Sequence, residues 1–411
     1  MSNGSLRATQ GWSRMETQAA MQVNAPTLAE PGRFTKATVA PGPRPRSISV
    51  LPKVQTAPSG EIELLHEPAD RYRPLGVLGT GGMGVVERAE DIDIGRPVAI
   101  KRLLPEASHA MGIARFVSEI RIVGSLDHPH VVPIHDVGVD DDGRYFFVMK
   151  YVEGRTLADV IDLLATGDAG ALAFWTFERR VELMIAVLQA LEYAHERGIV
   201  HRDIKPENIM IGAHGEIRLM DWGIAKRIGE REPGETITGE GKDAGATPGL
   251  IGTPAYMSPE QAACDELDAR SDLYSAAVTF HEFLALRHYL AHHADSLYGL
   301  IDAVQSEKVD IINFDNGGHG RLPPELGHFC DRGMAKDRAQ RFQSAGEMIA
   351  DLRNYIDGRY GVKCMFTATK RALREGGRLV DRRPRVAVAL AAAYSGFAVF
   401  GVASLIYMLV T

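Results

Sequence analysis

The chain of 411 residues contains little cysteine: Cys264, Cys330 and Cys364 are its only three. No two of them stand in the C-x-x-C spacing of zinc and thiol-redox sites, and three cysteines are too few for a disulfide scaffold. We therefore expect the protein to work in a reducing compartment. Apolar residues make up 45% of the chain and charged residues 24%, which excludes collagenous, coiled-coil and wholly disordered proteins.

The beginning of the sequence lacks the apolar segment that a secretory signal requires. Residues 1–65 are instead rich in Pro, Gly, Ser and Thr, with no sustained helical or strand periodicity. Such a segment cannot bury enough apolar surface to offset the entropy that it would lose on ordering. We expect a disordered Pro/Ser/Thr-rich tail over residues 1–65.

Charge is unevenly distributed along the chain. The formal net charge is −7, yet residues 1–60 carry +5, residues 363–385 carry +6 and residues 386–411 have no charged side chain. Subtracting these contributions from the total leaves −18 for residues 61–362. Nucleic-acid binding depends largely on cationic contacts with phosphates, so this acidic body excludes nucleic acid as an expected partner.

A long uncharged stretch lies near the C-terminal end. Residues 386–410 are 25 uncharged, mostly apolar residues. As a helix they would reach roughly 37 Å at about 1.5 Å per residue, enough to cross a hydrocarbon core of about 30 Å. The alternative, a buried core helix, is disfavoured by the length and by the lack of a polar stripe. Arginines precede the stretch, and basic residues mark the cytoplasmic side. We expect a single-pass transmembrane helix at the cell membrane, with a cytoplasmic body.

Two further expectations concern this part of the chain. Residues 354–385 are a basic juxtamembrane linker, and its basic stretch 363–385 should bind anionic lipid head groups, so that helix and flank both contact membrane lipid. Ala392 and Gly396 stand four residues apart in the span, a spacing that lets two helices pack closely. This spacing permits a homodimer, although a span rich in Ala and Gly contains such pairs by composition alone.

The body of the sequence changes from strand-like to helical patterns. Short strand-like stretches at Arg73–Leu78, Val85–Arg88 and Pro97–Lys101 are separated by turn residues. A helical pattern follows at Ile113–Val123, and most of the sequence after residue 156 is helical, as in Glu178–Arg197. Strands followed by helices predict an α+β protein with two lobes.

A glycine-rich motif lies between the first two strands. Gly79, Gly81, Gly84 and Val86 form the pattern G-x-G-x-x-G-x-V, and glycines allow a backbone turn to present N–H groups to phosphates. The same spacing occurs in dinucleotide-binding folds and in plain tight hairpins. A dinucleotide-binding motif would open a helix, whereas here a strand continues and ends in Val-Ala-Ile-Lys101.

Lys101 is unusual within an apolar strand. It could be an edge-strand lysine that extends to water. The functional alternative is a cation that faces nucleotide phosphates and is held by a carboxylate, which Glu119 on the next helix can supply.

The segment Val200–Met210 carries a second set of polar side chains. Asp203, Lys205 and Asn208 share one short loop after a long helix, and Asp221 follows in Met-Asp-Trp-Gly. An acid can accept a hydroxyl proton, a lysine can neutralise a transferring phosphoryl group, and amide and carboxylate oxygens suit Mg²⁺. A charged loop is often only solvated surface, but the additional carboxylate of Asp221 favours a catalytic site that binds Mg²⁺.

In this order, the motifs resemble those of the eukaryotic-type protein kinases. The glycine-rich loop and the segment Gly-Thr-Pro-Ala-Tyr-Met-Ser-Pro-Glu260 are most similar to the bacterial serine/threonine members, several of which are membrane-anchored. The resemblance covers roughly residues 72–353, about two-thirds of the chain. It implies a bilobal protein kinase domain, with a small β-rich lobe holding one helix and a larger helical lobe, and it implies ATP and Mg²⁺ as cofactors.

The resemblance also assigns roles to individual residues. Asp203 would be the catalytic base, and Lys101, paired with Glu119, would contact the ATP phosphates. The residues implied in catalysis are Asp203, Lys205, Lys101, Glu119 and Thr253, and those implied to hold Mg²⁺ are Asn208 and Asp221. The residues implied to bind ATP are Leu78, Gly79, Gly81, Gly84, Val86, Ala99, Lys101, Met149, Lys150, Tyr151, Val152 and Met210.

Three further matches concern support and specificity. Asp272 matches the acid that braces the catalytic loop, and Glu260 with Arg341 matches a buried ion pair of the large lobe. Lys205 and Thr253 fit the class that acts on serine and threonine hydroxyls. The implied function is phosphorylation of Ser and Thr on protein substrates, in signalling at the membrane.

Some residues depart from the family pattern. Trp222 stands in place of the usual Phe; it should pack against the Glu119 helix, and its indole N–H requires a partner. The resemblance implies that residues 147–152 are the hinge between the lobes, which contacts adenine through main-chain groups. Lys150 stands there where Glu is frequent, and little effect is expected because these contacts do not use its side chain. We expect an extended loop at residues 167–177, near the mouth of the active site. His292 and His293 have no further ligands at a useful spacing, so no metal site is predicted there.

Regulation is expected in the polar segment Lys226–Leu250. The resemblance implies that Arg202 pairs with a phosphorylated residue in this segment, and Thr236, Thr238 and Thr247 are the candidates for autophosphorylation. Each of them could equally be an ordinary loop residue.

Two other functions compete with an active kinase. A pseudokinase scaffold would bind partners without transferring phosphate, but every catalytic position is filled. A dinucleotide-dependent oxidoreductase lacks its strand-end acid and does not explain Lys101.

Overall fold

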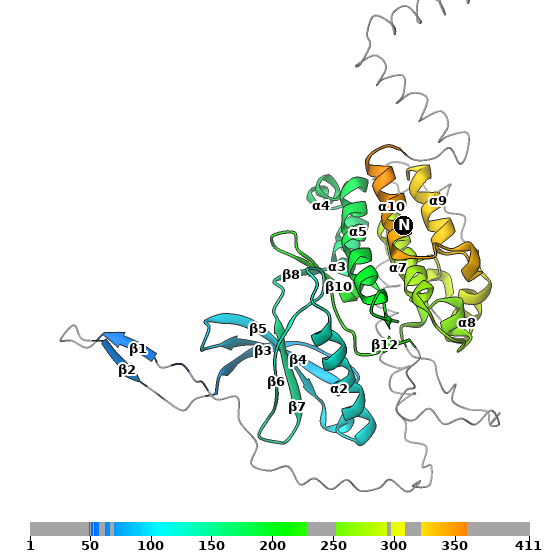
Figure 1. Ribbon diagram of the computed structural model, residues 1–411. Coiled ribbons are helices and arrows are strands. Elements are labelled where there is room, and N and C mark those ends of the chain that lie inside the picture. The colour runs from blue at the N-terminus through cyan, green and yellow to red at the C-terminus, as the bar shows by residue number, and fades with distance from the viewer. Residues whose placement is uncertain are drawn as a thin grey trace, which may run out of the picture.

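A computed structural model describes residues 49, 51, 53–56, 62–65, 70–228, 252–293, 297–308 and 322–359 (Figure 1). Several expectations lie outside these residues. They are most of the tail, the three candidate phosphorylation sites, the basic part of the linker and the apolar stretch 386–410. Within the described ranges, no helix combines the length and the apolar character needed to cross a membrane.

The small lobe is built on a five-stranded antiparallel sheet with the order β3-β4-β5-β7-β6. Helix α2 (Ala110–Ser125) lies across this sheet (Figure 1). Phe116 of α2 is fully buried and its ring centroid lies 5.4 Å from that of Phe147 on β7. The strands are β3 (Tyr72–Thr80), β4 (Gly84–Asp91), β5 (Arg96–Leu103), β6 (Ile134–Val139) and β7 (Tyr145–Lys150).

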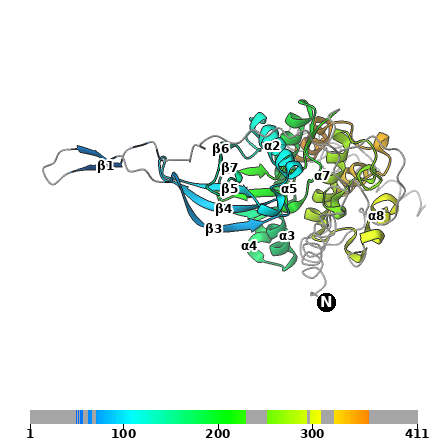
Figure 2. The same ribbon diagram turned by 90° about the horizontal axis from the view of Figure 1, so that it is seen from below.

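The large lobe is predominantly helical and is centred on α5 and α7. Their side chains fill one apolar core, which continues into α3, α9 and α10. The helices are α3 (Leu157–Ala165), α4 (Ala169–Phe174), α5 (Phe177–His195), α6 (Pro259–Ala262), α7 (Ala269–Ala285), α8 (Leu297–Ser306), α9 (Pro324–Gly333) and α10 (Ala345–Ile356). Two lobes, one of sheet and one of helices, confirm the predicted α+β architecture (Figures 1 and 2).

Short strands connect the two lobes and frame the loops of interest. Strand β8 (Gly154–Thr156) pairs with β10 (Ile209–Gly212), which pairs with β11 (Ile217–Leu219). Strand β9 (Ile199–Val200) pairs with β12 (Lys226–Arg227). Because β9 precedes the segment of Asp203 and β12 follows that of Asp221, this pairing brings the two loops together.

Two expectations from the sequence need correction. Strands β1 (Lys53–Thr56) and β2 (Ile62–Leu65) form an antiparallel pair inside the segment expected to be disordered (Figure 2). Their backbone groups pair with one another locally, with Lys53 opposite Leu65 and Thr56 opposite Ile62.

The predicted loop at residues 167–177 contains α4 instead. Asp168 caps this helix by accepting a hydrogen bond from the Ala171 amide at 2.7 Å. The ring centroid of Trp175 lies 5.6 Å from that of Phe283 in α7, which anchors the segment to the core. Figure 1 shows α4 beside one end of α5, away from the small-lobe sheet rather than at the mouth of the active site.

Candidate active site

Lys101 on β5 faces two carboxylates. Its Nζ lies 2.6 Å from Glu119 Oε1 on α2 and 3.2 Å from Asp221 Oδ1 after β11. Burial alone would lower the pKa of Lys101, but the charges of Asp221 and Glu119 outweigh it and raise that pKa. The Lys101 ammonium in turn lowers the pKa of Asp221. Lysine and half-exposed aspartate are therefore both charged, and three separate elements converge on one point.

Asp203 lies at the centre of a compact hydrogen-bonded group. Thr253 donates to Asp203 Oδ1 from its amide at 3.1 Å and from its hydroxyl at 2.9 Å. Lys205 Nζ lies 2.6 Å from Thr253 Oγ1 and 3.3 Å from Asp203 Oδ2. The carboxylate, the ammonium and the hydroxyl thus contact one another directly, although Thr253 is 50 residues from Asp203 in the sequence.

Asn208 joins this group to Asp221. Its amide nitrogen donates to the carbonyl of Asp203 at 2.9 Å and to Asp203 Oδ2 at 3.1 Å, so its Oδ1 is the atom left to face a cation. The carbonyl of Asn208 accepts from the amide of Met220 at 2.8 Å, which fixes the residue before Asp221. Neighbouring backbone segments thereby carry the amide oxygen of Asn208 and the carboxylate of Asp221. Oxygen ligands of this kind are those that Mg²⁺ prefers.

A buried carboxylate holds the loop of Asp203 in shape. Asp272 on α7 accepts hydrogen bonds from the amides of His201 and Arg202, both at 2.8 Å, and from His195 Nε2 at 2.8 Å. Burial opposes its charge, but these contacts hold the pKa of Asp272 below its usual range. Arg202 has a φ of +71°, a strained value for a side chain of this size. Asp272 stabilises this backbone turn and so positions the adjacent Asp203.

A second buried pair supports the segment after Thr253. Arg341 donates to both oxygens of Glu260 at 2.7 and 2.8 Å, and Ser271 donates to Glu260 Oε1 at 2.7 Å. Arg341 and Glu260 are almost fully buried. Ser258, whose side chain caps α6, places Glu260 in the first turn of that helix.

The glycine-rich turn joins β3 to β4. The amide of Gly81 donates to the carbonyl of Gly84 at 2.8 Å. A Cβ added at Gly84 would lie only 2.8 Å from the carbonyl oxygen of Arg102, so no larger residue fits there. Leu78 and Gly79 on β3 are exposed beside this turn.

The remaining residues predicted to bind ATP lie on strands and at the link between the lobes. In the sheet register Val86 lies opposite Lys101, and Ala99 opposite Met149. Lys150 ends β7, Tyr151 and Val152 connect it to β8, and Met210 lies on β10. The amide of Lys150 donates to the carbonyl of Pro133 at 3.1 Å, so this N–H is not available to a ligand.

His201 is a site residue to which the sequence gave no role. Its Nε2 donates to the carbonyl of Met220 at 3.0 Å, and its Nδ1 accepts from the amide of Asp203 at 3.3 Å. Burial lowers the pKa of His201, which keeps the ring neutral in this arrangement. The ring therefore links both loops of the site. Its position in the sequence, directly before Arg202 and Asp203, is the feature from which this role could have been predicted.

Gln261 is a second contact that the sequence analysis did not assign. Its Nε2 donates to the carbonyl of Arg202 at 2.9 Å. The contact joins the start of α6 to the strained turn beside Asp203, and nothing in the local sequence around either residue predicts it.

Comparison with known proteins is consistent with this geometry. The family model described as "Protein kinase domain" matches residues 72–351. A probable serine/threonine-protein kinase of Streptomyces coelicolor is 37% identical over 312 residues, covering 75% of this chain and 42% of the relative. The serine/threonine-protein kinase PknB of Mycobacterium tuberculosis is 34% identical over 294 residues, covering 71% and 44%. The chain thus spans less than half the length of these relatives.

Proposed function

The chain belongs to the protein kinase family, and we propose that it is an active serine/threonine kinase that transfers the γ-phosphoryl group of ATP to hydroxyl groups of proteins. The observation that carries the proposal is the contact of Asp203, Lys205 and Thr253. It sets a proton acceptor, a cation and a hydroxyl around the place where an acceptor hydroxyl would meet the phosphoryl group.

The residues fit ATP and Mg²⁺. The glycine-rich turn can bring backbone N–H groups close to phosphates, and a Cβ added at Gly79 would meet no atom within 4 Å. Gly84 is required for a different reason, the close approach of the Arg102 carbonyl on β5. Asn208 Oδ1 and the Asp221 carboxylate would hold Mg²⁺, which when bound neutralises phosphate charge. Lys101, held in place by Glu119, would contact the ATP phosphates directly.

Asp203 would orient the acceptor hydroxyl and take up its proton. Phosphoryl transfer requires mainly positioning and charge neutralisation, because the protein does little covalent chemistry in it. Lys205 would stabilise the negative charge that develops on the transferred group. Thr253 holds both side chains in place through its hydroxyl, which makes it the positioning residue of the group.

Thr253 gives the sharpest test of this proposal. The full chain, purified in detergent micelles, is incubated with labelled Mg-ATP and a generic acceptor protein, and the labelled amino acids of the acceptor are identified. We expect phosphoserine and phosphothreonine, a rate at least about tenfold lower for Thr253→Val, and near wild-type transfer for Thr253→Ser. Label on tyrosine alone, or a Thr253→Val variant as active as wild type, would overturn the proposal.

We further propose that the enzyme phosphorylates its own segment 226–250. The backbone of Arg202 is held by Asp272 and by Gln261, and a fixed cation directly before Asp203 supports a role in receiving a phosphate from this segment. Phosphopeptide mapping after incubation with Mg-ATP should find label on Thr236, Thr238 or Thr247. A fully active enzyme without label in this segment would refute this part of the proposal.

We also propose that the kinase acts at the cytoplasmic face of the cell membrane. The support is the sequence alone: the apolar stretch 386–410 and the basic residues before it. Membrane fractions should retain the full chain after a high-salt wash, whereas a chain ending at residue 385 should remain in the supernatant. Retention of the shortened chain would contradict anchoring by this stretch.

A further inference from the structure

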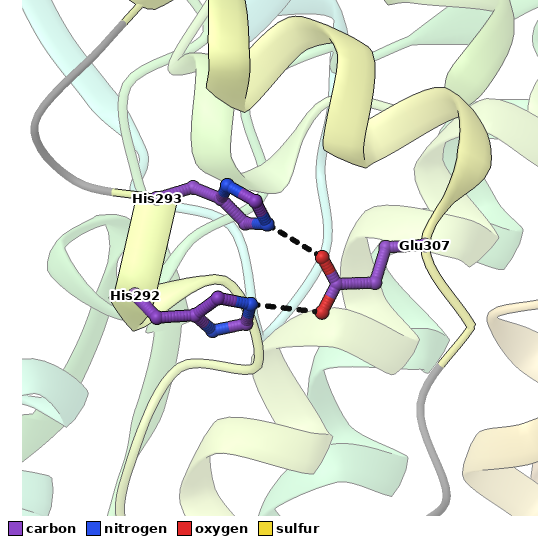
Figure 3. A group of neighbouring side chains, drawn as sticks. All are labelled: His292, His293 and Glu307. Carbon is purple, nitrogen blue, oxygen red and sulfur yellow. Dashed lines mark hydrogen bonds and ion pairs between the residues drawn. The ribbon is translucent and has the colours of Figure 1, made fainter.

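Two histidines and a glutamate meet on the large lobe, away from the residues that contact Asp203. His292 Nε2 lies 3.1 Å from Glu307 Oε1, and His293 Nε2 lies 2.6 Å from Glu307 Oε2. Figure 3 shows both imidazole rings pointing at the carboxylate, one at each oxygen. The histidines are neighbours, but Glu307 is 14 residues beyond His293, so the spacing in the sequence gave no sign of a third ligand.

We propose that His292, His293 and Glu307 form a binding site for a divalent transition-metal ion of the Zn²⁺ type. Two imidazole nitrogens and one carboxylate oxygen are the ligand set that Zn²⁺ accepts when solvent completes its coordination. Imidazole also favours Zn²⁺ and related ions over Mg²⁺ and Ca²⁺, which prefer oxygen ligands. The site is therefore distinct in chemistry from the oxygen pair of Asn208 and Asp221.

The distances suit such an ion. One ligand atom from each of the three residues lies within 4.8 Å of the other two. Ligands at about 2.1 Å from a tetrahedral Zn²⁺ lie roughly 3.4 Å apart. Small rotations of the three side chains are thus sufficient, without movement of the backbone. The hydrogen bond between His293 and Glu307 and the ion pair between His292 and Glu307 would be replaced by bonds to the metal.

The backbone that carries the ligands is held in place. The histidines end the short 3₁₀ helix η4 (Ala291–His293), where the amide of His293 donates to the carbonyl of Leu290 at 2.9 Å. Glu307 extends the end of α8, and its amide donates to the carbonyl of Ala303 at 2.8 Å. An ion would therefore join two backbone segments, η4 and the end of α8, that are already in place. Little further ordering of the chain is needed on binding.

The ligand atoms are accessible from solvent. The side chains of His292, His293 and Glu307 are 62%, 33% and 29% exposed. Lys308 and Lys336 line the same surface hollow as Glu307. The Nζ of Lys336 donates to the carbonyl of Val304 at 2.6 Å and to the Tyr274 hydroxyl at 3.0 Å. The two oxygens of Glu307 remain directed at the histidines, and water can fill the remaining coordination positions of an ion.

The place of the site gives it a structural consequence. Helix α8 packs against α6 and against η3 (Pro254–Tyr256), which directly follows Thr253. A metal ion that joins η4 to the end of α8 would stabilise this part of the large lobe. Because an ion that binds only the folded protein stabilises it by mass action, the melting temperature should rise with Zn²⁺ concentration.

The test measures Zn²⁺ binding by the full chain in detergent micelles, with excess Mg²⁺ to occupy oxygen sites and a weak colorimetric chelator as competitor. We expect one Zn²⁺ per chain. Loss of groups that merely support ligands costs about 10–100-fold in affinity, so His293→Ala and Glu307→Gln should each weaken binding by at least about tenfold. His214→Ala and Glu196→Gln remove an exposed imidazole and an exposed carboxylate elsewhere and should bind as wild type does.

Co²⁺ supplies a second readout that does not depend on affinity alone. Its visible absorption reports imidazole and carboxylate coordination, and the bands should disappear in His293→Ala while the melting temperature without metal stays unchanged. The free cysteine Cys264 is present in every variant, so metal held there would not distinguish them. Wild-type chain that fails to compete with the weak chelator, or binding unaffected by changes at His292, His293 and Glu307, would overturn the proposal.

Discussion

The indole ring of Trp222 lies against the imidazole ring of His201, with the ring centroids 4.4 Å apart. Trp222 is 1% exposed and belongs to the same apolar core as Ile122 and Val123 of the Glu119 helix. The expected packing toward that helix is thus present. Among the described residues, however, none accepts a hydrogen bond from its Nε1. The aromatic residue that follows Asp221 therefore packs well but leaves one polar atom unsatisfied.

Replacement of Trp222 by Phe should consequently cost little. A buried donor without a partner is unfavourable by about 1–3 kcal/mol, and its removal offsets the packing lost with the smaller ring. We expect Trp222→Phe to unfold within about 1 kcal/mol of wild type, whereas Trp222→Ala should lose about 3–5 kcal/mol. Urea unfolding followed by circular dichroism measures both. A loss above about 2 kcal/mol for Trp222→Phe would show that the indole N–H has a partner.

Variants of the pair Lys101 and Glu119 should distinguish its contribution to stability from its contribution to activity. Glu119 is 3% exposed, and burial raises its pKa while Lys101 acts against this shift. Lys101→Met leaves a buried carboxylate without its cation, which we expect to cost about 3–5 kcal/mol. The double variant Lys101→Met/Glu119→Leu should regain most of that stability and remain inactive. Urea unfolding and labelled-phosphate transfer test the two halves, and an active double variant would exclude the role assigned to Lys101.

Glu282 should make stability depend on pH. This carboxyl is buried on α7 and accepts a hydrogen bond from the Tyr256 hydroxyl at 2.6 Å. Burial raises its pKa to about 8 from an ordinary value of 4.5. The folded state then holds a proton that the unfolded state has released, so this contribution to stability is complete below about pH 4.5 and is lost as pH rises through about 8.

Glu282→Gln tests this pH dependence because the amide keeps the shape and an acceptor oxygen but does not titrate. We expect the free energy of unfolding of wild type to decline between about pH 5 and 8 more steeply than that of the variant. Urea midpoints measured across this range are sufficient. Parallel curves for the two proteins would show that folding does not raise the pKa of Glu282.

The buried pair of Glu260 and Arg341 is expected to be structural. Both side chains are almost fully buried, so removal of one leaves an uncompensated charge in the core. Arg341→Met should therefore cost about 3–5 kcal/mol in urea unfolding. The matched change Arg332→Met, at a half-exposed pair with Glu347, should cost about 1 kcal/mol or less. Equal losses in the two variants would contradict this difference in burial.

The sequence predicted the elements whose signals are local. The strands around Gly79 and Lys101 and the helix of Glu119 lie where the periodicity placed them, because each alternates or repeats within a few residues. The spacing of Asp203 to Asn208 likewise stays within one loop. These features need no knowledge of the rest of the chain.

The parts that could not be predicted depend on contacts between distant segments. Helix α4 forms where a loop was expected because Trp175 packs on Phe283, more than a hundred residues away. The meeting of Glu307 with His292 and His293 depends on how α8 is placed against the large lobe, and the unsatisfied indole of Trp222 depends on what surrounds it in the core. None of these contacts has a signal in its own segment.

The most direct test of the central claim is the rate of labelled-phosphate transfer by the full chain with Asp203→Asn, measured beside wild type. Asp127→Asn, which neutralises an exposed acid elsewhere, is the matched control. If Asp203 orients and deprotonates the acceptor hydroxyl, its variant should lose at least about a hundredfold in rate, and the control should equal wild type. An Asp203→Asn enzyme as fast as wild type would contradict the account.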